Sequence, residues 1–258
     1  MNLIELNGVK LEVQRIGFTV ARQHLAPLVF LHEGLGSVAM WRDWPQALCH
    51  ATGRAGWVYS RRGYGQSDTV ADVRHSGKLQ SDYMHEEAWA VLPALLKALA
   101  IEQPVLVGHS DGATIALLYA SRHPVSACIA MAPHVMVEDV SVRAIEQARS
   151  SFETGDLRER LARYHANIDC AFWQWNDIWL NPAFRAFDIR QDCSRIAAPV
   201  LALQGMDDPY GTLQQIEQIS LPDSQITRRT LAQCGHSPHR DQTDLTTRAI
   251  TDFLASAA

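Results

Sequence analysis

The segment Gly108-His109-Ser110-Asp111-Gly112 places a serine between two glycines, directly after the apolar run Val105 to Val107. The residues after it, from Ala113 onward, have the spacing of a helix. A serine on a sharp strand-to-helix turn exposes its hydroxyl oxygen, and the flanking glycines are needed because side chains would collide in so tight a turn. Free N–H groups at the helix start favour developing negative charge. Ser110 is therefore a candidate nucleophile.

A serine hydroxyl is a weak nucleophile at neutral pH and needs a base within hydrogen-bond distance. Two histidines, His236 and His239, follow a strand-like segment late in the chain. Two adjacent acids, Asp207 and Asp208, follow the apolar run Val200 to Leu203. A hydroxyl, an imidazole and a carboxylate together can carry out acyl transfer through a covalent intermediate.

Short apolar runs alternate with helical patterns along the chain. Runs of this length without polar alternation are typical of strands buried on both faces of a parallel sheet. The runs are Leu28 to Leu31, Gly56 to Tyr59, Val105 to Val107, Cys128 to Met131 and Val200 to Leu203. Helical spacing occurs at His85 to Ala100, Ala113 to Arg122 and Leu245 to Leu254. The alternation predicts a doubly wound α/β fold.

Two segments depart from that alternation. Asn7-Gly8 lies between two strand-like segments and predicts a tight hairpin turn. Residues 138–198 contain no convincing strand, but they have helical spacing at Val142 to Ser151 and Leu157 to Ala166, and an aromatic cluster, FWQWNDIW. We interpret 138–198 as a helical cap over one end of the sheet, and residues 1–137 and 199–258 as the core.

Five segments resemble, in order, the signature stretches of the α/β-hydrolase superfamily. They are LVFLHEGLGS, YSRRGYGQSD, VLVGHSDGATIA, LQGMDDPYG and AQCGHSPHRDQ. The resemblance covers nearly the whole chain, and the insertion is similar to that family's cap. It implies the α/β-hydrolase fold, with a mostly parallel central sheet, helices on both faces and a helical cap inserted late in the chain.

The same resemblance implies which residues act together. The catalytic residues of that fold follow in the order serine, acid, histidine. The family's spacing of glycine, two residues and then the acid favours Asp208, and leaves Asp207 as an exposed turn residue. The family's Gly-His setting favours His236 as the base over His239, which we interpret as a solvated residue at the start of the last helix. Ser110, Asp208 and His236 are thus the expected triad.

The resemblance also implies an oxyanion hole formed by the N–H groups of Asp111 and Gly34. The family usually has His-Gly before the second donor, whereas this chain has His32-Glu33. Glu33 is open to two interpretations. It is either a pocket carboxylate that binds a polar substrate group or, as we prefer, a residue paired with Arg61 or Arg62. His32 is expected to hold the turn through hydrogen bonds.

Aromatic residues near the expected site are candidates for the substrate pocket. Trp41, His134 and Tyr210 come just after strands, at the sheet edge where ligands bind in such folds. Trp173 and Trp179 lie in the insertion, where at least one tryptophan is expected to cover an apolar pocket above Ser110. The alternative is that these indoles only attach the cap to the core. Together with Glu33, these residues form the expected pocket.

Composition excludes several classes of function. A formal net charge of -5 gives no electrostatic footprint for nucleic acid, and no apolar stretch has the length of a membrane span. The start of the chain has neither a basic nor an apolar region typical of a secretory signal. Five cysteines without a CxxC pair are typical of reduced thiols in the cytoplasm. No metal site and no cofactor are expected, and monomer and homo-oligomer both stay open.

These observations predict a serine hydrolase that cleaves a small carboxylic ester, lactone or thioester with an apolar part, through an acyl-enzyme. A serine at this position argues against a haloalkane dehalogenase, because a chain that resembled that class of enzyme would have a carboxylate there. One alternative is hydrolysis of a C–C bond in a vinylogous diketone. Another, from a different class, is a non-catalytic ligand-binding member of the fold, since fold alone does not establish function.

Overall fold

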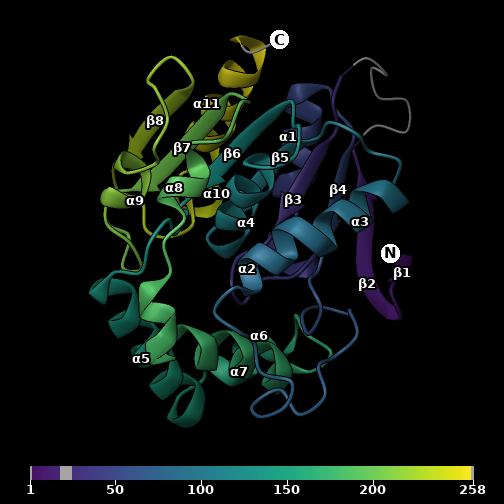
Figure 1. The fold of residues 1–258 in the computed structure, drawn as a ribbon, viewed down its shortest axis with the longest axis vertical. Helices are drawn as coiled ribbons and strands as arrows, with labels where there is room; N and C mark the ends of the chain where they lie inside the picture. Colours follow the sequence, from purple (N-terminus) through teal and green to yellow (C-terminus); the bar gives the residue numbers. More distant parts are fainter. Residues whose placement is uncertain (1, 18–24, 257–258) are drawn as a thin grey trace.

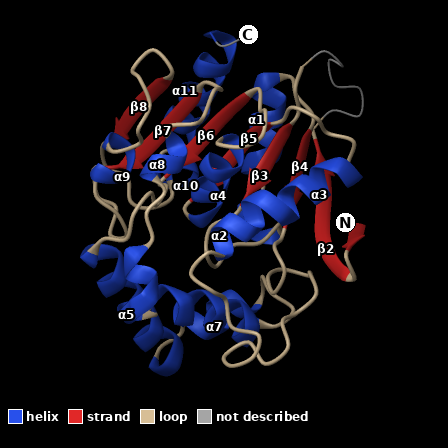
Figure 2. Ribbon diagram, in the orientation of Figure 1, coloured by secondary structure: helices blue, strands red, loops and turns tan. Residues whose placement is uncertain are grey.

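A computed structural model describes residues 2–17 and 25–256 of the chain. Its centre is an eight-stranded sheet in the order β1-β2-β4-β3-β5-β6-β7-β8 (Figures 1 and 2). The strands are β1 (Asn2–Leu6), β2 (Val9–Ile16), β3 (Leu28–Leu31), β4 (Gly56–Tyr59), β5 (Val105–His109), β6 (Ala127–Met131), β7 (Val200–Gly205) and β8 (Ile226–Leu231). The β1–β2 and β2–β4 pairs are antiparallel, whereas the pairs from β4 to β8 are parallel. The predicted, mostly parallel sheet is confirmed.

The sequence patterns located these strands closely. The five apolar runs are β3 to β7, with one or two residues added at the ends of β5, β6 and β7. The predicted hairpin turn joins β1 to β2, and both Asn7 and Gly8 have positive φ angles, of 52° and 80°. An Asn-Gly pair suits this turn because both residues tolerate the left-handed region.

Helices cover both faces of the sheet, as predicted. Because successive side chains in a strand point to opposite faces, each buried strand contributes to two apolar clusters. In β3, Leu28 and Phe30 pack in one cluster with α1 (Trp44–Thr52) and α11 (Thr243–Ser256). Val29 and Leu31 pack in the other, with α3 (Leu92–Ala98) and α4 (Asp111–Ala120). Figure 1 shows α3 and α4 in front of the sheet and α1 and α11 behind it.

The other helices of the core are short. The helix predicted over His85 to Ala100 is α2 (Tyr83–Glu86), a π-helical turn η2 (Glu87–Val91) and α3 in direct succession. The remaining core elements are η1 (Ala39–Trp41), α9 (Gln214–Glu217) and α10 (Pro238–Asp241), whereas α8 (Arg190–Cys193) lies near the end of the segment 138–198. Over the described residues, no helix has both the length and the apolar character that a bilayer span requires.

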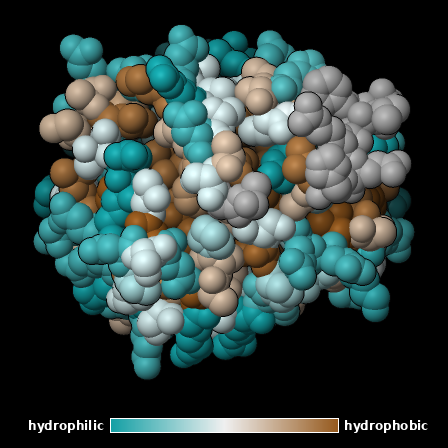
Figure 3. Space-filling view, turned by 90° about the horizontal axis from the view of Figure 1, so that it is seen from above, coloured by the Kyte–Doolittle hydropathy of each residue, from teal (hydrophilic) through white to brown (hydrophobic). Residues whose placement is uncertain are grey.

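The chain between β6 and β7 forms a group of helices. They are α5 (Asp139–Thr154), α6 (Leu157–Ala162), α7 (Ile168–Trp179) and η3 (Pro182–Ala186), followed by α8. The only strand-like pairing within this described segment is an isolated bridge between Met136 and Asp188. In Figures 1 and 2, α5 and α7 lie below the sheet, beyond the carboxyl ends of its parallel strands. The opposite end of the molecule mixes hydrophilic and hydrophobic side chains (Figure 3).

Candidate active site

The turn after β5 has the geometry that its sequence predicts. Ser110 has φ 53° and ψ −121°, a conformation that side chains rarely adopt, and only 5% of the residue is exposed. A Cβ on Gly108 would overlap the backbone of the next helix, and one on Gly112 would overlap the backbone of β3. Only glycine therefore lets α4 and β3 approach the turn this closely. The strained serine is held by the hydrogen bond from its N–H to the Met131 carbonyl, at 2.9 Å.

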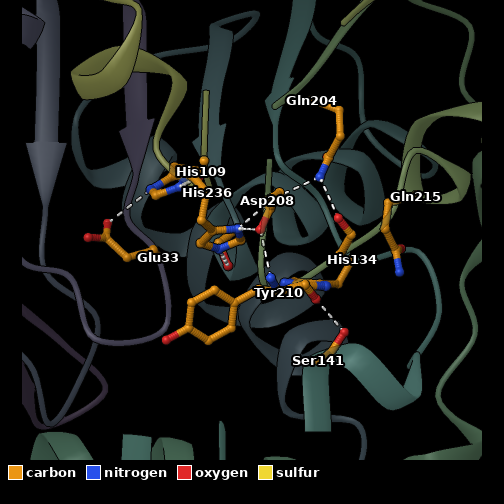
Figure 4. A network of polar contacts seen from close by, with 12 residues as sticks. Glu33, His109, His134, Ser141, Gln204, Asp208, Tyr210, Gln215 and His236 are labelled. Atoms are coloured by element: carbon orange, nitrogen blue, oxygen red, sulfur yellow. Dashed lines mark hydrogen bonds and ion pairs between the residues drawn. The ribbon is translucent and has the colours of Figure 1, made fainter. Parts of the chain in front are cut away.

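Three polar side chains from separate loops meet at this turn. His236 Nε2 lies 2.9 Å from Ser110 Oγ. The other ring nitrogen, His236 Nδ1, lies 2.8 Å and 3.0 Å from the two carboxylate oxygens of Asp208 (Figure 4). The carboxylate can only accept, so the Nδ1 atom carries the proton. The Nε2 lone pair is then directed at the serine hydroxyl, which is the arrangement a general base needs.

Asp208 is held as an ionised acceptor. Besides His236, it accepts hydrogen bonds from the Tyr210 N–H at 2.7 Å and from Gln204 Nε2 at 2.8 Å. Burial alone would raise the pKa of the Asp208 carboxyl, but His236 and the Tyr210 N–H bring that pKa below its ordinary value. The adjacent Asp207 is exposed. Of the two acids, only Asp208 contacts the histidine.

A cavity of about 110 Å³ opens above Ser110. Four of the predicted pocket residues line it: Glu33, His134, Trp179 and Tyr210. The Tyr210 ring lies 4.8 Å from the His236 ring, centroid to centroid, and the His134 ring lies 5.6 Å from it. Burial lowers the pKa of His134 to about 3, with the nearby His236 acting in the same direction. A neutral imidazole and a phenol thus border the histidine that faces Ser110.

Trp175 also lines the cavity, although no sequence pattern separates it from the neighbouring tryptophans. It lies four residues before Trp179 on α7, so both indoles occupy one face of that helix. A Cβ on Gly34 would overlap Nε1 and Cδ1 of the Trp175 ring. The indole therefore covers Gly34 directly. Leu35 and Ile145 complete the apolar part of the wall and were likewise not predicted.

The two predicted oxyanion donors, Gly34 and Asp111, line this same cavity. One guanidinium holds both of their segments. Arg61 donates to the carbonyl oxygens of His32 at 2.6 Å and Glu33 at 3.1 Å, and its Nη2 lies 3.8 Å from Asp111 Oδ2. Arg61 is 4% exposed, so its positive charge is buried directly behind the loop that contains Gly34. His32 also holds the turn, since it donates to the Glu33 carbonyl and accepts from the Arg61 N–H.

Asp111 carries a buried carboxyl next to the serine. Tyr83 donates to its Oδ2 at 2.7 Å, and burial raises the pKa of the carboxyl although Arg61 and Tyr83 both act to lower it. The indole N–H of Trp179 acts on the same carboxyl, through a contact that falls short of full hydrogen-bond geometry. Tyr83, Arg61 and Trp179 thus surround a carboxyl that sequence reasoning considered only for its main-chain N–H.

The preferred interpretation of Glu33 is wrong. Its carboxylate pairs with neither Arg61 nor Arg62, because Arg61 is directed at main-chain carbonyls instead. The carboxylate oxygens lie 3.4 Å from His109 Nδ1 and 3.6 Å from Arg240 Nη2. Both partners come from segments distant in sequence, so spacing along the chain could not identify them.

Three other predictions about side-chain placement are also wrong. Trp41 does not line the cavity; it stacks with Trp44 on the other face of the sheet. His239 is not solvated, because its ring is packed against both of these indoles at centroid distances of 4.9 Å and 5.2 Å. Trp173 faces away from the cavity and stacks under the guanidinium of Arg74, 3.7 Å from the ring centroid.

A larger cavity of about 340 Å³ lies beside this site, between the β1–β2 hairpin, the loop after β4 and the α2–α3 helix. Arg61 and Tyr83 line it and also contact Asp111, but Ser110 does not reach it. Across residues 2–17 and 25–256, no group of three or more His, Cys, Asp or Glu side chains is arranged to hold a metal ion.

Comparison with known proteins places the chain in a family. Residues 26–166, more than half of the chain, match the family model described as alpha/beta hydrolase fold. The chain belongs to the α/β-hydrolase family. Among its relatives in this family is the sn-1-specific diacylglycerol lipase ABHD11 of Mus musculus, which is 25% identical over 90% of this chain and 81% of the relative.

Solved structures of α/β-hydrolases share the fold over the full length of the chain. The meta-cleavage product hydrolase CumD from Pseudomonas fluorescens IP01 has a TM-score of 0.75 at 19% identity and covers 100% of this chain, with 98% of its own chain matched. The enol-lactonase from Burkholderia xenovorans LB400 has a TM-score of 0.71 at 20% identity, with 98% of this chain and 100% of that chain covered. At these identities the similarity establishes the fold.

Proposed function

We propose that this α/β-hydrolase is a serine hydrolase that cleaves a small carboxylic ester, lactone or thioester through an acyl-enzyme. In this proposal Ser110 is the nucleophile, His236 the general base and Asp208 the acid that orients it. The observation that carries the proposal is the unbroken series of short contacts from Asp208 through His236 to Ser110 Oγ. The series ends on a serine in a strained turn, where strain is typical of functional residues.

A side chain of the site can be assigned to each proton transfer of the proposed reaction. His236 Nε2 takes the hydroxyl proton as Ser110 Oγ attacks the substrate carbonyl, and Asp208 stabilises the imidazolium that forms. The same imidazolium then protonates the departing alcohol or thiol. Water, activated by His236, hydrolyses the acyl-enzyme and releases Ser110.

We propose the N–H groups of Gly34 and Asp111 as the oxyanion hole. Asp111 is the first residue of α4, so the positive end of the helix dipole faces the developing charge. The buried Arg61 adds a full positive charge behind both donors and fixes the carbonyl groups that precede Gly34. Donors held rigidly at the place where charge develops are typically the largest single contribution to catalysis.

The substrate is proposed to be a small molecule with an apolar part. The cavity above Ser110 is only about 110 Å³, and its wall is mostly aromatic and aliphatic, with Trp175, Trp179, Leu35 and Ile145. Similar proteins include a diacylglycerol lipase and an enol-lactonase, which favours an ester or lactone as the substrate. We also propose that residues 138–198 act as a cap over the core, since α5 and α7 supply three of these wall residues.

A substrate panel tests the proposal. Wild-type protein should hydrolyse short-chain p-nitrophenyl esters faster than a ring-fission diketone, and Ser110→Ala should lose about a millionfold of that turnover. His236→Ala should match this loss. Turnover of the diketone alone would indicate the C–C hydrolase alternative. Binding of ligands without turnover of any substrate would indicate the non-catalytic alternative.

A further inference from the structure

A second acid–histidine pair lies directly behind the Ser110–His236–Asp208 array. Glu33 Oε2 lies 3.4 Å from His109 Nδ1, and His109 Nε2 lies 2.6 Å from the main-chain carbonyl oxygen of His236 (Figure 4). The His109 side chain is 1% exposed and that of Glu33 is 14% exposed. A carboxylate in the loop before Gly34 is thus connected, through one buried imidazole, to the backbone of the proposed base.

The contacts of His109 indicate where each of its two nitrogens is directed. A carbonyl oxygen only accepts, so His109 Nε2 carries a hydrogen. If Nδ1 had no hydrogen, its lone pair would face a carboxylate oxygen, which is repulsive. Burial would raise the pKa of Glu33, but His109, followed by Arg240, brings that pKa well below its ordinary value. Glu33 is therefore ionised, and its carboxylate faces His109 Nδ1, a buried atom with no other polar partner among the described residues.

We propose that Glu33 and His109 are positioning residues for the base: the Glu33 carboxylate holds His109 as a cation, and the charged N–H of His109 fixes the carbonyl of His236. This proposal rests on the proposed function, in which His236 is the base. A hydrogen bond from a charged donor is shorter and roughly twice as strong as a neutral one. The 2.6 Å contact from His109 therefore orients the His236 backbone, while Asp208 orients the ring.

Glu33 is held in place by contacts on several sides, as a positioning residue must be. Arg240 approaches Glu33 Oε1 at 3.6 Å and also donates to the Met40 carbonyl at 2.7 Å. The Glu33 carbonyl accepts from Arg61. A Cβ on Gly36 would come within 2.5 Å of Glu33 Oε2, so the tight loop leaves the carboxylate little room to move.

The pair also balances charge during the reaction. The titratable rings nearest to His109 are those of His236 and His239, at centroid distances of 5.1 Å and 4.9 Å. Burial holds the pKa of His239 well below its ordinary value, so His239 adds no charge. When His236 takes the serine proton, two imidazolium rings lie side by side. Asp208 then offsets the charge of one ring, and Glu33 offsets that of the other.

A double-mutant cycle on ester turnover tests the proposal, with Glu33→Gln, His109→Phe and the double variant. His109→Phe removes the donor to the His236 carbonyl and should lower kcat by about thirtyfold, with KM nearly unchanged. Glu33→Gln leaves a neutral donor and should lower kcat by about fivefold. The double variant should be no slower than His109→Phe alone, because the acid acts through the imidazole. His109→Gln, whose amide can donate to the same carbonyl, should recover most of the rate.

Losses that multiply in the double variant, or a rise in KM at unchanged kcat, would overturn the proposal. Glu12→Gln serves as the matched control: Glu12 is a buried carboxylate that accepts from Ser60 and from the Gln66 N–H, away from His109. It should lower stability without changing kcat.

A spectroscopic measurement on the wild-type protein keeps the test independent of variant folding. The ¹⁵N resonances of His109 at pH 7.5 should be those of an imidazolium with two N–H groups, and a neutral ring would overturn the proposal. Failure of the wild type to turn over any ester would instead count against the proposed function. Unchanged kcat in both single variants of an active enzyme would count against the positioning role alone.

Discussion

Replacing Gly34 with alanine should disable the enzyme through a single steric contact. The added methyl group would overlap Nε1 and Cδ1 of Trp175, the indole that covers this loop. Carbon contacts are favourable only near about 3.5 Å, so either the indole or the loop must move by roughly 1 Å. Movement of the loop carries the Gly34 N–H away from its proposed place in the oxyanion hole.

The size of the effect on stability and on kcat depends on whether the Trp175 indole or the Gly34 loop moves. Overpacking of this kind lowers the free energy of unfolding by about 1–3 kcal/mol. Loss of one oxyanion donor lowers kcat by about a hundredfold to a thousandfold. Gly34→Ala should therefore lower kcat by about a hundredfold or more, while the protein still unfolds cooperatively in urea.

The decisive comparison uses Trp175→Ala as the background. Removing the indole creates space for the methyl group, so Gly34→Ala should cost only about fivefold in kcat when Trp175 is already alanine. Steady-state kinetics on one p-nitrophenyl ester gives all four values of the cycle. Equal losses in the two backgrounds would refute the reasoning, because the indole would then not be the cause.

Three further predictions follow from the site. Asp208→Asn should lower kcat by about ten-thousandfold through the wrong histidine tautomer, whereas Asp207→Asn should stay within severalfold of wild type; the reverse pattern would overturn the choice of acid. Arg61→Met removes the cation that faces Asp111 and should lower the free energy of unfolding by about 3–5 kcal/mol in urea titrations; an unchanged midpoint would refute a structural role for this buried charge. The pKa of His134 is lowered to about 3 in the fold, so below its unfolded value of about 6.5 the unfolded chain binds one proton more and stability falls as pH falls. His134→Leu should therefore lessen the slope of unfolding free energy against pH by about 1.4 kcal/mol per pH unit between pH 6 and 4; identical slopes would contradict a neutral buried ring.

The strands and the elbow could be predicted from the sequence because local patterns determine them. A run such as Val200 to Leu203 is too short and too apolar for an exposed element, and it forms the first four residues of β7. Parallel strands bring their carboxyl ends to one edge, so residues that follow β5, β7 and β8 meet there. Ser110, Asp208 and His236 are such residues, and the family resemblance, through its chain order and spacing, predicted that they lie together.

Side-chain direction could not be predicted in the same way. Trp173 and Trp175 are two residues apart on α7 and therefore point to opposite sides of the helix, but which side faces Ser110 depends on how α7 lies on the core. Trp41 follows a strand at the expected edge, yet the turn η1 directs its ring to the other face of the sheet. His239 has polar neighbours in sequence and apolar ones in space.

Glu33 shows most clearly that the partners of a side chain could not be predicted from the sequence. Glu33 stands where the family usually has glycine, which marks it as unusual, and the preferred interpretation pairs it with Arg61 or Arg62. Arg61 is instead used by the carbonyls of His32 and Glu33, which no sequence pattern reveals. The partner that matters, His109, precedes Ser110 in the elbow itself and was overlooked because its role depends on the fold bringing β3 beside β5.

The most direct test of the central claim is the site of covalent modification. Wild-type protein is incubated with a fluorophosphonate, digested, and its peptides are mapped by mass spectrometry, with Ser110→Ala and His236→Ala treated in parallel. One adduct is expected, on Ser110, and it should be absent from Ser110→Ala and form far more slowly in His236→Ala. An adduct on another residue, or ester turnover by a wild-type protein whose Ser110 stays unmodified, would contradict Ser110 as the nucleophile.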